Sequence, residues 1–413
     1  MELKPGYKHT EVGVIPNDWD VLRLSDACAK IQDGTHFSPS SGGNEYLYIT
    51  SKNIRFGYID ISTATRIDKR QHDAIYRRCD VKKGDLLLTK DGANTGNAAL
   101  NTLDEEISLL SSVAFLRFDP EMHHAPYFLQ QILSKGGQRQ IQEAMSGNAI
   151  TRLTLNKINR LRVPIPRILK EEEQIAQILS DADALIESLE QLLAKKRQIK
   201  QGAMQELLTG KKRLPGFGGK WELKQLSDLA TIQRGASPRP IDSPIWFDDN
   251  STVGWVRISD VTSSGMFLCE TTQRLSPQGI HNSRPVSQGS LIMSICATVG
   301  RPVITQIDVC IHDGFVVFGN LRVAREFLYY VLKFIEDDWS RHGQTGSQMN
   351  LNTDLINRTE VSVPSIVEEQ IAIAAVLSDM DAAISALETK LAKARQLKQG
   401  MMQELLTGRI RLV

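Results

Sequence analysis

The chain has 413 residues, with 49 Lys and Arg against 48 Asp and Glu, so its formal net charge is +1. This length and a hydrophobic content of 41% predict a globular protein of two or three domains. The even charge balance excludes a uniformly basic chain, so any nucleic-acid site must be local. The charged N-terminus lacks a signal peptide and no long apolar run is evident, which predicts a cytoplasmic protein without a membrane segment.

The first 165 residues are expected to form a mixed α/β domain. Runs rich in β-formers at residues 46–50, 85–89 and 113–118 predict strands, and residues 126–145 predict a helix. Residues 66–83 carry a net charge of +4, which indicates phosphate contacts or, with equal weight, a solvated surface. The basic side chains of this cluster are Arg66, Lys69, Arg70, Arg77, Arg78, Lys82 and Lys83.

Two loops, near the start and the end of this domain, carry side chains of the kinds that read base edges. The candidates are Thr35, His36, Asn148 and Arg152. The same residue types are common in turns, so a purely structural role stays open for each of them.

A central helical region follows at residues 166–212. From about residue 171 to residue 209 it contains no proline and a single glycine. Its apolar positions fall at spacings of four, three and seven, which predicts a coiled-coil seam of Leu185, Leu189, Leu192 and Ile199. A helix of about 38 residues would span ~57 Å at ~1.5 Å per residue.

Residues 213–362 are expected to form a second domain of the same kind. Strands are predicted at 252–258, 290–294 and 314–318, and a helix at 324–341. Two loops at positions equivalent to those of the first domain supply further candidates for contacts with base edges. These candidates are Arg234, Ser237, Arg239, Gln344, Ser347 and Gln348.

The C-terminal helical region, residues 363–413, repeats the central one. Residues 180–214 and 378–412 align at an offset of 198 with 24 identities in 35 positions. The starts of the two domains also match, as at Trp19 and Trp221. The second seam is predicted at Ile384, Leu387, Leu391 and Ala394. The sequence therefore contains an internal repeat of one domain and one helix. The predicted fold class is α+β, with two similar mixed α/β domains joined by two long helices that form an antiparallel coiled coil with pseudo-two-fold symmetry.

Familiar catalytic signatures are missing from the sequence. It contains no Pro-Pro, so the tetrapeptide that grips a flipped amino base is absent, and no GxGxxG, Walker A or GxSxG motif stands in its required context. The eight histidines and five cysteines show no spacing typical of a metal site. We therefore predict no catalytic, cofactor-binding or metal site in this chain.

Four segments carry a resemblance to a known family. They are LKQGMMQELLTGRIRL at residues 397–412, its twin IKQGAMQELLTGKKRL at 199–214, GVIPNDW at 13–19 and VPSIVEEQIAIAAVLSDMD at 363–381. The chain resembles the specificity (S) subunit of Type I restriction-modification systems over nearly its whole length. The family motifs lie mainly in the helices, whereas the recognition domains vary, so base contacts cannot be carried over.

The resemblance implies a non-catalytic DNA-recognition subunit that acts in host defence. Each target-recognition domain would read one half of an asymmetric bipartite target in double-stranded DNA. Two DNA methyltransferase (M) subunits would bind S-adenosylmethionine, and restriction (R) subunits of the full complex would use ATP, so no cofactor is expected in this chain.

Two alternatives remain at the level of sequence. One is the DNA-recognition subunit of another multi-subunit restriction system of the Type IIB kind. The other is a coiled-coil adaptor with two protein-binding domains, which a requirement for a specific DNA sequence would exclude.

Overall fold

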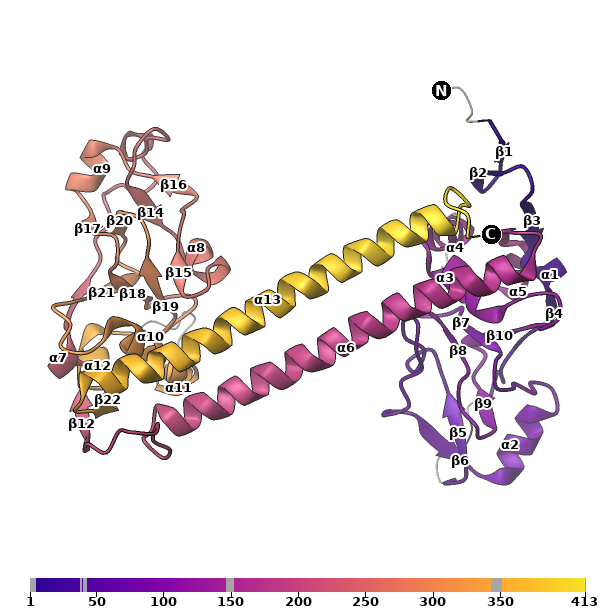
Figure 1. Cartoon of the computed structure of the whole chain (residues 1–413), viewed down its shortest axis with the longest axis horizontal. Coiled ribbons are helices and arrows are strands. Elements are labelled where there is room, and N and C mark those ends of the chain that lie inside the picture. The colour runs from indigo at the N-terminus through magenta and orange to yellow at the C-terminus, as the bar shows by residue number, and fades with distance from the viewer. Residues whose placement is uncertain (1–4, 38, 40–42, 146–151, 343–350, 413) are drawn as a thin grey trace. The chain divides into compact units, whose positions relative to one another are not determined.

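The computed structural model describes residues 5–37, 39, 43–145, 152–342 and 351–412. The chain divides into two compact units, unit 1 with Met1–Glu190 and Thr389–Val413, and unit 2 with Gln191–Glu388. Two helices of 39 residues each, α6 (Leu169–Leu207) and α13 (Val367–Leu405), contribute to both units (Figure 1). Each unit therefore combines one globular block with half of each long helix.

The globular block of unit 1 is a mixed α/β domain, as expected. Its strands are β1 (Tyr7–Thr10), β2 (Gly13–Pro16), β3 (Asp20–Arg23), β4 (Cys28–Asp33), β5 (Tyr46–Ile49), β6 (Thr65–Ile67), β7 (Leu86–Thr89), β8 (Ala98–Leu100), β9 (Ile107–Leu109), β10 (Val113–Phe118) and β11 (Arg162–Ile165). Its helices are α1 (Leu24–Ala27), α2 (Lys69–Tyr76), α3 (Ala125–Leu133), α4 (Lys135–Met145) and α5 (Leu155–Arg160).

The main sheet of unit 1 has the strand order β4-β10-β7-β8, with all neighbours antiparallel. Alternate residues of its strands enter two different cores, because successive side chains of a strand point to opposite faces. In β7, Leu86 and Leu88 pack with Trp19 and the helices, whereas Leu87 packs with a second sheet of order β6-β5-β9. This sheet is buried on both faces, which explains why its strands read as continuous apolar runs.

Unit 2 repeats this frame. Its strands are β12 (Trp221–Gln225), β13 (Thr231–Arg234), β14 (Gly254–Val256), β15 (Phe267–Leu268), β16 (Gln273–Arg274), β17 (Arg284–Val286), β18 (Leu291–Ser294), β19 (Pro302–Thr305), β20 (Val309–Ile311), β21 (Phe315–Gly319) and β22 (Glu360–Pro364). Its helices are α7 (Leu226–Leu229), η1 (Pro244–Trp246), α8 (Ile258–Ser263), α9 (Pro277–His281), α10 (Arg325–Phe334), α11 (Glu336–His342) and α12 (Thr353–Arg358).

The main sheet of unit 2, of order β13-β21-β18-β19-β15, also lies between two cores. Leu291 and Met293 of β18 pack with the helices, whereas Ile292 packs with the second sheet, of order β16-β14-β20-β17. β18 thus occupies the place that β7 has in unit 1, as the repeat predicts.

The helix predicted over residues 126–145 is interrupted. Ser134 has an extended backbone and ends α3, and α4 begins at the next residue. A Cβ on Gly137 would lie 2.3 Å from the carbonyl oxygen of Gln131, so the two helices approach each other as closely as glycine permits. The predicted helix over 324–341 is likewise divided into α10 and α11.

The paired halves of α6 and α13 run antiparallel in both units. In unit 1, Lys398 pairs with Asp183 and Arg395 with Glu190, so residue numbers fall along α13 as they rise along α6. In unit 2, Lys200 pairs with Asp381 and Arg197 with Glu388 in the same sense. The expected antiparallel pairing therefore holds within each unit.

The residues of the seam differ in part from the prediction. Leu189 and Leu391 are buried, and Ile384, Leu387 and Ala394 are half-buried. Leu185, Leu192 and Ile199 are instead exposed, at 49%, 40% and 47%, which corrects their assignment to the seam. Leu193 is buried although it was not predicted. Ile186, Leu193 and Lys200, each one residue after an exposed predicted position, are half-buried or buried. The buried stripe of α6 is therefore turned by one residue from the predicted seam.

The ends of the long helices are anchored in the same way in both units. Gly210 and Gly408 follow the helices with φ of 69° and 68°, the left-handed conformation in which glycine commonly ends a helix. Beyond Gly408, Arg411 donates to the fully buried carboxylate of Glu171 and lies over the ring of Trp19. Arg213 pairs with Glu369 and lies over Trp221 in unit 2 in the same way.

By length and composition alone, α13 is also apolar enough to cross a membrane, with a mean hydropathy of 1.4 in its most apolar stretch. The sequence-based statement that no such run is evident is therefore too strong. Core helices of soluble proteins pass the same test, and Ile373, Ala374 and Leu377 of α13 are buried in the core of unit 2.

Candidate nucleic-acid interface

In unit 1, three strand ends meet at one edge of the main sheet. β4 ends at Asp33 and β7 at Thr89, while Gly34 donates its N–H to the carbonyl of Val113, the first residue of β10. A Cβ on Gly34 would lie 2.0 Å from the carbonyl oxygen of Leu109, so only glycine allows this approach. The first of the two loops that carry the predicted candidates of the first domain starts from this edge.

An ionic network links those loops. We call it strand-end cluster 1, formed by Asp33, His36, Lys90, Asp91 and Arg152. Lys90 is 7% exposed, and its Nζ lies 3.4 Å from a carboxylate oxygen of Asp33 and 3.1 Å from one of Asp91. Arg152 donates to Asp91 from Nε at 2.7 Å and from Nη2 at 3.1 Å. His36 Nε2 lies 3.7 Å from Asp33. The cluster therefore joins the loop after β4 to the segment before α5.

Thr35 also lies at this edge, but its polar groups form hydrogen bonds with backbone groups of the protein. Its N–H donates to the carbonyl of Leu109 at 2.8 Å, and its own carbonyl accepts from Ser111 at 2.7 Å. Its hydroxyl accepts from the backbone N–H of Phe37 at 3.3 Å. Thr35 is thus part of the frame, whereas His36 and Arg152 present exposed side chains, at 61% and 55%.

Unit 2 has an edge of the same construction with different side chains. β13 ends at Arg234, and Gly235 donates to the carbonyl of Phe315, the first residue of β21. A Cβ on Gly235 would lie 2.1 Å from the carbonyl oxygen of His312. The match between Gly34 and Gly235 in the sequence therefore reflects the same close approach of two backbones.

Asp313 organises this second edge. We call strand-end cluster 2 the group of Arg234, Ser237, Arg239, His312 and Asp313. Ser237 Oγ donates to the Asp313 carboxylate at 2.6 Å, Arg239 lies 3.3 Å from it, and Arg234 Nε donates to the Asp313 carbonyl at 2.6 Å. The hydrogen bond from Ser237 and the charge of Arg239 lower the pKa of Asp313 against the opposing effect of burial. All three candidates predicted on the first loop thus bind one residue, Ser237 and Arg239 through the carboxylate of Asp313 and Arg234 through its backbone carbonyl.

His312 acts as a neutral part of cluster 2. Burial lowers its pKa below 6.5, and its Nδ1 accepts from the N–H of Gly314 at 2.9 Å, as a neutral ring can. Its ring lies 5.8 Å from that of Trp255, between centroids. The histidine therefore supports the edge and contributes no positive charge to it at neutral pH.

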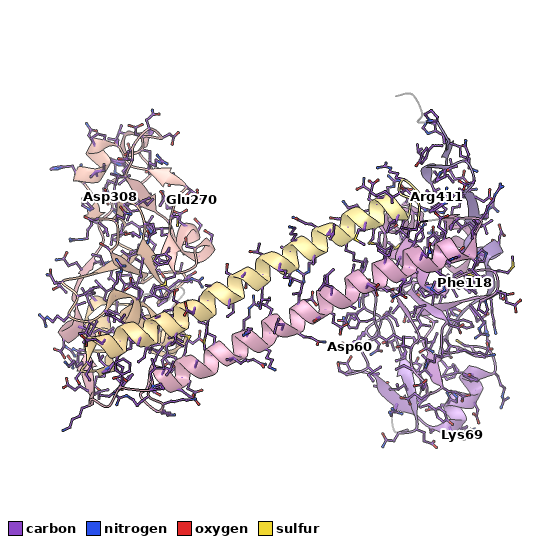
Figure 2. The ribbon with its side chains drawn as sticks, in the orientation of Figure 1. Asp60, Lys69, Phe118, Glu270, Asp308 and Arg411 are labelled. Carbon is purple, nitrogen blue, oxygen red and sulfur yellow. The ribbon has the colours of Figure 1, made fainter. Side chains whose placement is uncertain are left out.

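The basic cluster of residues 66–83 does not join these edges. Lys82 and Lys83 precede β7 and Lys90 follows it, so the whole of β7, which spans about 13 Å at ~3.3 Å per residue, lies between them. Three of its members are paired with carboxylates, Arg66 with Glu105, Lys69 with Asp73 and Lys83 with Asp104. Figure 2 shows Lys69 at the far end of the unit 1 block from Arg411. Arg70, Arg77, Arg78 and Lys82 are exposed.

Four further candidates, Asn148, Gln344, Ser347 and Gln348, lie outside the described residues. The segments that follow them do reach the two edges. Leu153 donates its N–H to the carbonyl of Lys90 at 3.0 Å, and Leu351 donates to the carbonyl of Ile295 at 2.9 Å. In each domain the described end of the second predicted loop therefore reaches the edge where the first loop begins.

The charged side chains that hold these candidates, namely Asp33, Lys90, Asp91 and Asp313, were not predicted from the sequence. A usable signal was present, because Lys90-Asp91-Gly92 follows directly after the apolar run of β7. Polar residues at the end of a buried strand are common positions for binding groups. The pairing of Asp91 with Arg152 joins residues 61 positions apart and could not be read from spacing.

One group of side chains has the connectivity of a catalytic triad. His72 lies 2.9 Å from the Ser108 hydroxyl and 3.2 Å from the Glu106 carboxylate. Ser108 is 0% exposed and the His72 ring is stacked on Tyr46 with 3.8 Å between centroids, so no substrate can reach the hydroxyl. Among the described residues no group of three or more His, Cys, Asp or Glu could hold a metal ion.

Comparisons with known proteins agree with the repeat. Residues 16–200 and 218–396 each match the model of the Type I restriction modification DNA specificity domain. The chain is 24% identical over 429 residues to the Type I restriction enzyme MjaVIII specificity subunit of Methanocaldococcus jannaschii, covering 96% of this chain and 94% of the relative.

Solved structures share the fold. The S subunit of a Type I restriction-modification system from M. genitalium superposes with a TM-score of 0.62 at 14% identity, covering 98% of both chains. A chain from a structure on the complex assembly and conformational transition of a Type I system superposes with a TM-score of 0.57 at 18% identity, covering 96% of this chain and 99% of the other. Two copies of the specificity domain account for most of the sequence, and the chain therefore belongs to the family of specificity subunits of Type I restriction-modification systems.

Proposed function

We propose that the chain reads an asymmetric bipartite target in double-stranded DNA, with one half-site per unit. The observation that carries this proposal is that clusters 1 and 2 stand at equivalent strand ends and are built from different sets of side chains. Cluster 1 offers His36 and Arg152, whereas cluster 2 offers Arg234 and Arg239. Identical readers would favour a palindrome, and different readers favour two unrelated half-sites.

The near-neutral charge of the chain favours a reader that shares its phosphate contacts with partners. Most protein–DNA hydrogen bonds go to the backbone, and they require more free positive charge than a net charge of +1 supplies. We infer that the chain binds DNA weakly alone and tightly with methyltransferase subunits. Those subunits would hold S-adenosylmethionine, restriction subunits would use ATP, and the complex would act in the cytoplasm.

Two equivalent places on the long helices suit the docking of two methyltransferase subunits. Ile199 on the unit 2 half of α6 and Leu397 on the unit 1 half of α13 are partners in the repeat, and they are 47% and 62% exposed. An apolar side chain that is exposed at the same position in both copies is typical of a surface that a partner covers.

The test is a selection of duplex DNA from a random library by the full-length chain assembled with its methyltransferase. We expect an enriched sequence with two dissimilar specified halves around an unspecified spacer. Replacing residues 16–165 with the corresponding domain of another S subunit should change one half and keep the other. A continuous or palindromic motif would contradict the proposal, and so would a domain exchange that changed both halves.

A second reading, the recognition subunit of a Type IIB-like system, predicts the same bipartite target. It differs in the partner, because methylation and cleavage would then lie in one polypeptide. Copurification of the chain with its native partners distinguishes the two.

A further inference from the structure

Arg152 is held in one orientation at the edge of unit 1. Its Nε and Nη2 both donate to the Asp91 carboxylate, which is a side-on pair that fixes the plane of the guanidinium. The side chain is nevertheless 55% exposed. An exposed arginine normally samples many rotamers and loses this freedom when it binds, so a guanidinium that is already fixed binds at a lower entropic cost.

The Asp91 carboxylate that holds Arg152 is itself held by a buried lysine. Lys90 lies under the edge, 7% exposed, with its ammonium between Asp91 and Asp33. Burial alone would raise the pKa of Asp91, but hydrogen bonds from Arg152 and Lys90 outweigh that effect and lower it. Asp91 therefore stays ionised at neutral pH and keeps its hold on Arg152.

The frame of the domain does not need these charges. Ile295 in unit 2 stands where Lys90 stands in unit 1, directly after the equivalent strand, and its carbonyl accepts the equivalent backbone hydrogen bond. Ile295 is 1% exposed, so an apolar residue fills the same place. Buried ion pairs generally stabilise a fold no better than apolar residues of similar size. The Asp33–Lys90–Asp91 chain must therefore serve the group that it positions.

We propose that Arg152 reads a guanine in the half-site of unit 1, with Asp91 and Lys90 as its positioning residues. This proposal rests on the proposed function and names one of its base contacts. The side-on pair uses the Nε hydrogen and one hydrogen of Nη2, which leaves the end-on fork of Nη1 and Nη2 pointing away from Asp91. Guanine is the base that offers two adjacent acceptors, N7 and O6, to such a fork in the major groove.

A phosphate is the other ligand that a guanidinium fork recognises, and the surroundings of Arg152 disfavour it. Asp91 lies within 2.7 Å of Arg152 and is 16% exposed, so its negative charge opposes the approach of a phosphate. A base edge carries no net charge and meets no such repulsion. The arrangement thus suits base reading, whereas unpaired lysines and arginines suit phosphates.

The experiment compares variants of the full-length chain, assembled with its methyltransferase, in selection from a random duplex library and in binding at several salt concentrations. Arg152→Lys keeps the charge but removes the planar fork. It should lower discrimination at one guanine by about 5- to 150-fold, the range expected for one bidentate contact, and leave the salt dependence unchanged. Arg152→Gln should lose the same preference, and Asp91→Asn should weaken it at the same position.

The control is Arg139→Gln, which removes an arginine that is 69% exposed on α4 and is paired within its helix, with Glu143. It should leave the selected sequence unchanged. A uniform loss of affinity on all sequences with a flatter salt dependence in Arg152→Gln would show a phosphate contact and overturn the proposal. An unchanged motif in all Arg152 variants would also overturn it. If the unaltered chain selected no bipartite sequence, the proposed function itself would fail.

Discussion

Buried charges in this protein are placed where they fix another group. Glu171 and Glu369, both fully buried, receive the arginine that follows a long helix, and Lys90 lies under the acidic pair of cluster 1. Sequence spacing could predict which loops carry polar residues, but not which of those residues are neutralised. That distinction depends on contacts between residues that are far apart in the chain.

Asp80 gives a residue-scale prediction about pH. Burial alone would raise its pKa, but hydrogen bonds from Lys30 and Arg117 outweigh burial and lower it from 3.8 to about 2. A carboxyl whose pKa is lowered by folding stabilises the protein above its unfolded pKa and loses this effect as pH falls through the folded value. We expect Asp80→Asn to lower the free energy of unfolding by a constant amount between pH 7 and about 4.5, and the difference to shrink towards pH 2.

Urea titrations of both proteins at a series of pH values measure this difference. Asp354→Asn is the control, because Asp354 is 70% exposed in a pair within one helix, with Arg358, and should contribute little at any pH. A difference between wild type and Asp80→Asn that grew as the pH fell from 4 would contradict the assignment of Asp80 to this pair.

At the scale of elements, periodicity predicted the parts of the fold that neighbouring residues determine. β7, β10, β18 and the two long helices lie where the apolar runs and the 3–4 spacing placed them. The break at Ser134 was missed, because it depends on contact between Gly137 and the preceding helix. The seam was predicted only in part, since packing against the globular blocks decides which stripe of α6 is buried.

The anchor of α13 can be tested by removing Arg411. Because Glu171 is fully buried, Arg411→Met leaves an unpaired carboxylate in the core and should lower the free energy of unfolding by about 3–5 kcal/mol. The double variant Arg411→Met with Glu171→Met should recover most of this loss. Arg409→Met is the matched control, because Arg409 is 51% exposed and should cost at most about 1 kcal/mol. Chemical denaturation measures all four proteins, and equal losses in the single and double variants would refute the anchor.

The exposed helix positions predict how many methyltransferase subunits bind. Ile199→Glu should remove one of two methyltransferase subunits and Leu397→Glu the other, because a charge at the centre of an apolar contact is costly to bury. The double variant should bind none. Leu223→Glu, at a position on β12 that is 65% exposed, is the control and should keep both. Native mass spectrometry of the reconstituted complex counts the subunits, and full occupancy in the double variant would place the docking surface elsewhere.

At the scale of the whole molecule, the chain contains two copies of one structural frame, and the two copies carry different side chains at their strand ends. The frame consists of the helix anchors, the ion pairs along the helices and the glycines at Gly34 and Gly235, all of which recur in both units. The filling consists of the side chains at the strand ends, which share almost nothing. Repetition could therefore be detected in the sequence, while the ion pairs that distinguish the two strand-end clusters had to be taken from the structure.

The two long helices are the segments that link the units, so their length should set the spacer of the DNA target. The test inserts four residues after Glu190 in α6 and four after Glu388 in α13, which leaves every ion pair within each unit intact. Each helix gains about 6 Å and about 40° of rotation, at ~1.5 Å and ~100° per residue. One base pair adds ~3.4 Å and ~35°, so the selected spacer should lengthen by one or two base pairs while both half-sites stay the same.

Insertions of two residues at the same places are the control for this ruler. They add only about 3 Å but rotate one unit relative to the other by about 200°, which turns it away from the face of the duplex that it reads. Selection of the bipartite target should then be lost, although each unit still folds, as thermal unfolding can verify. If both insertions left the spacer unaltered, the helices would be tethers, and the methyltransferase subunits would have to fix the distance between the half-sites.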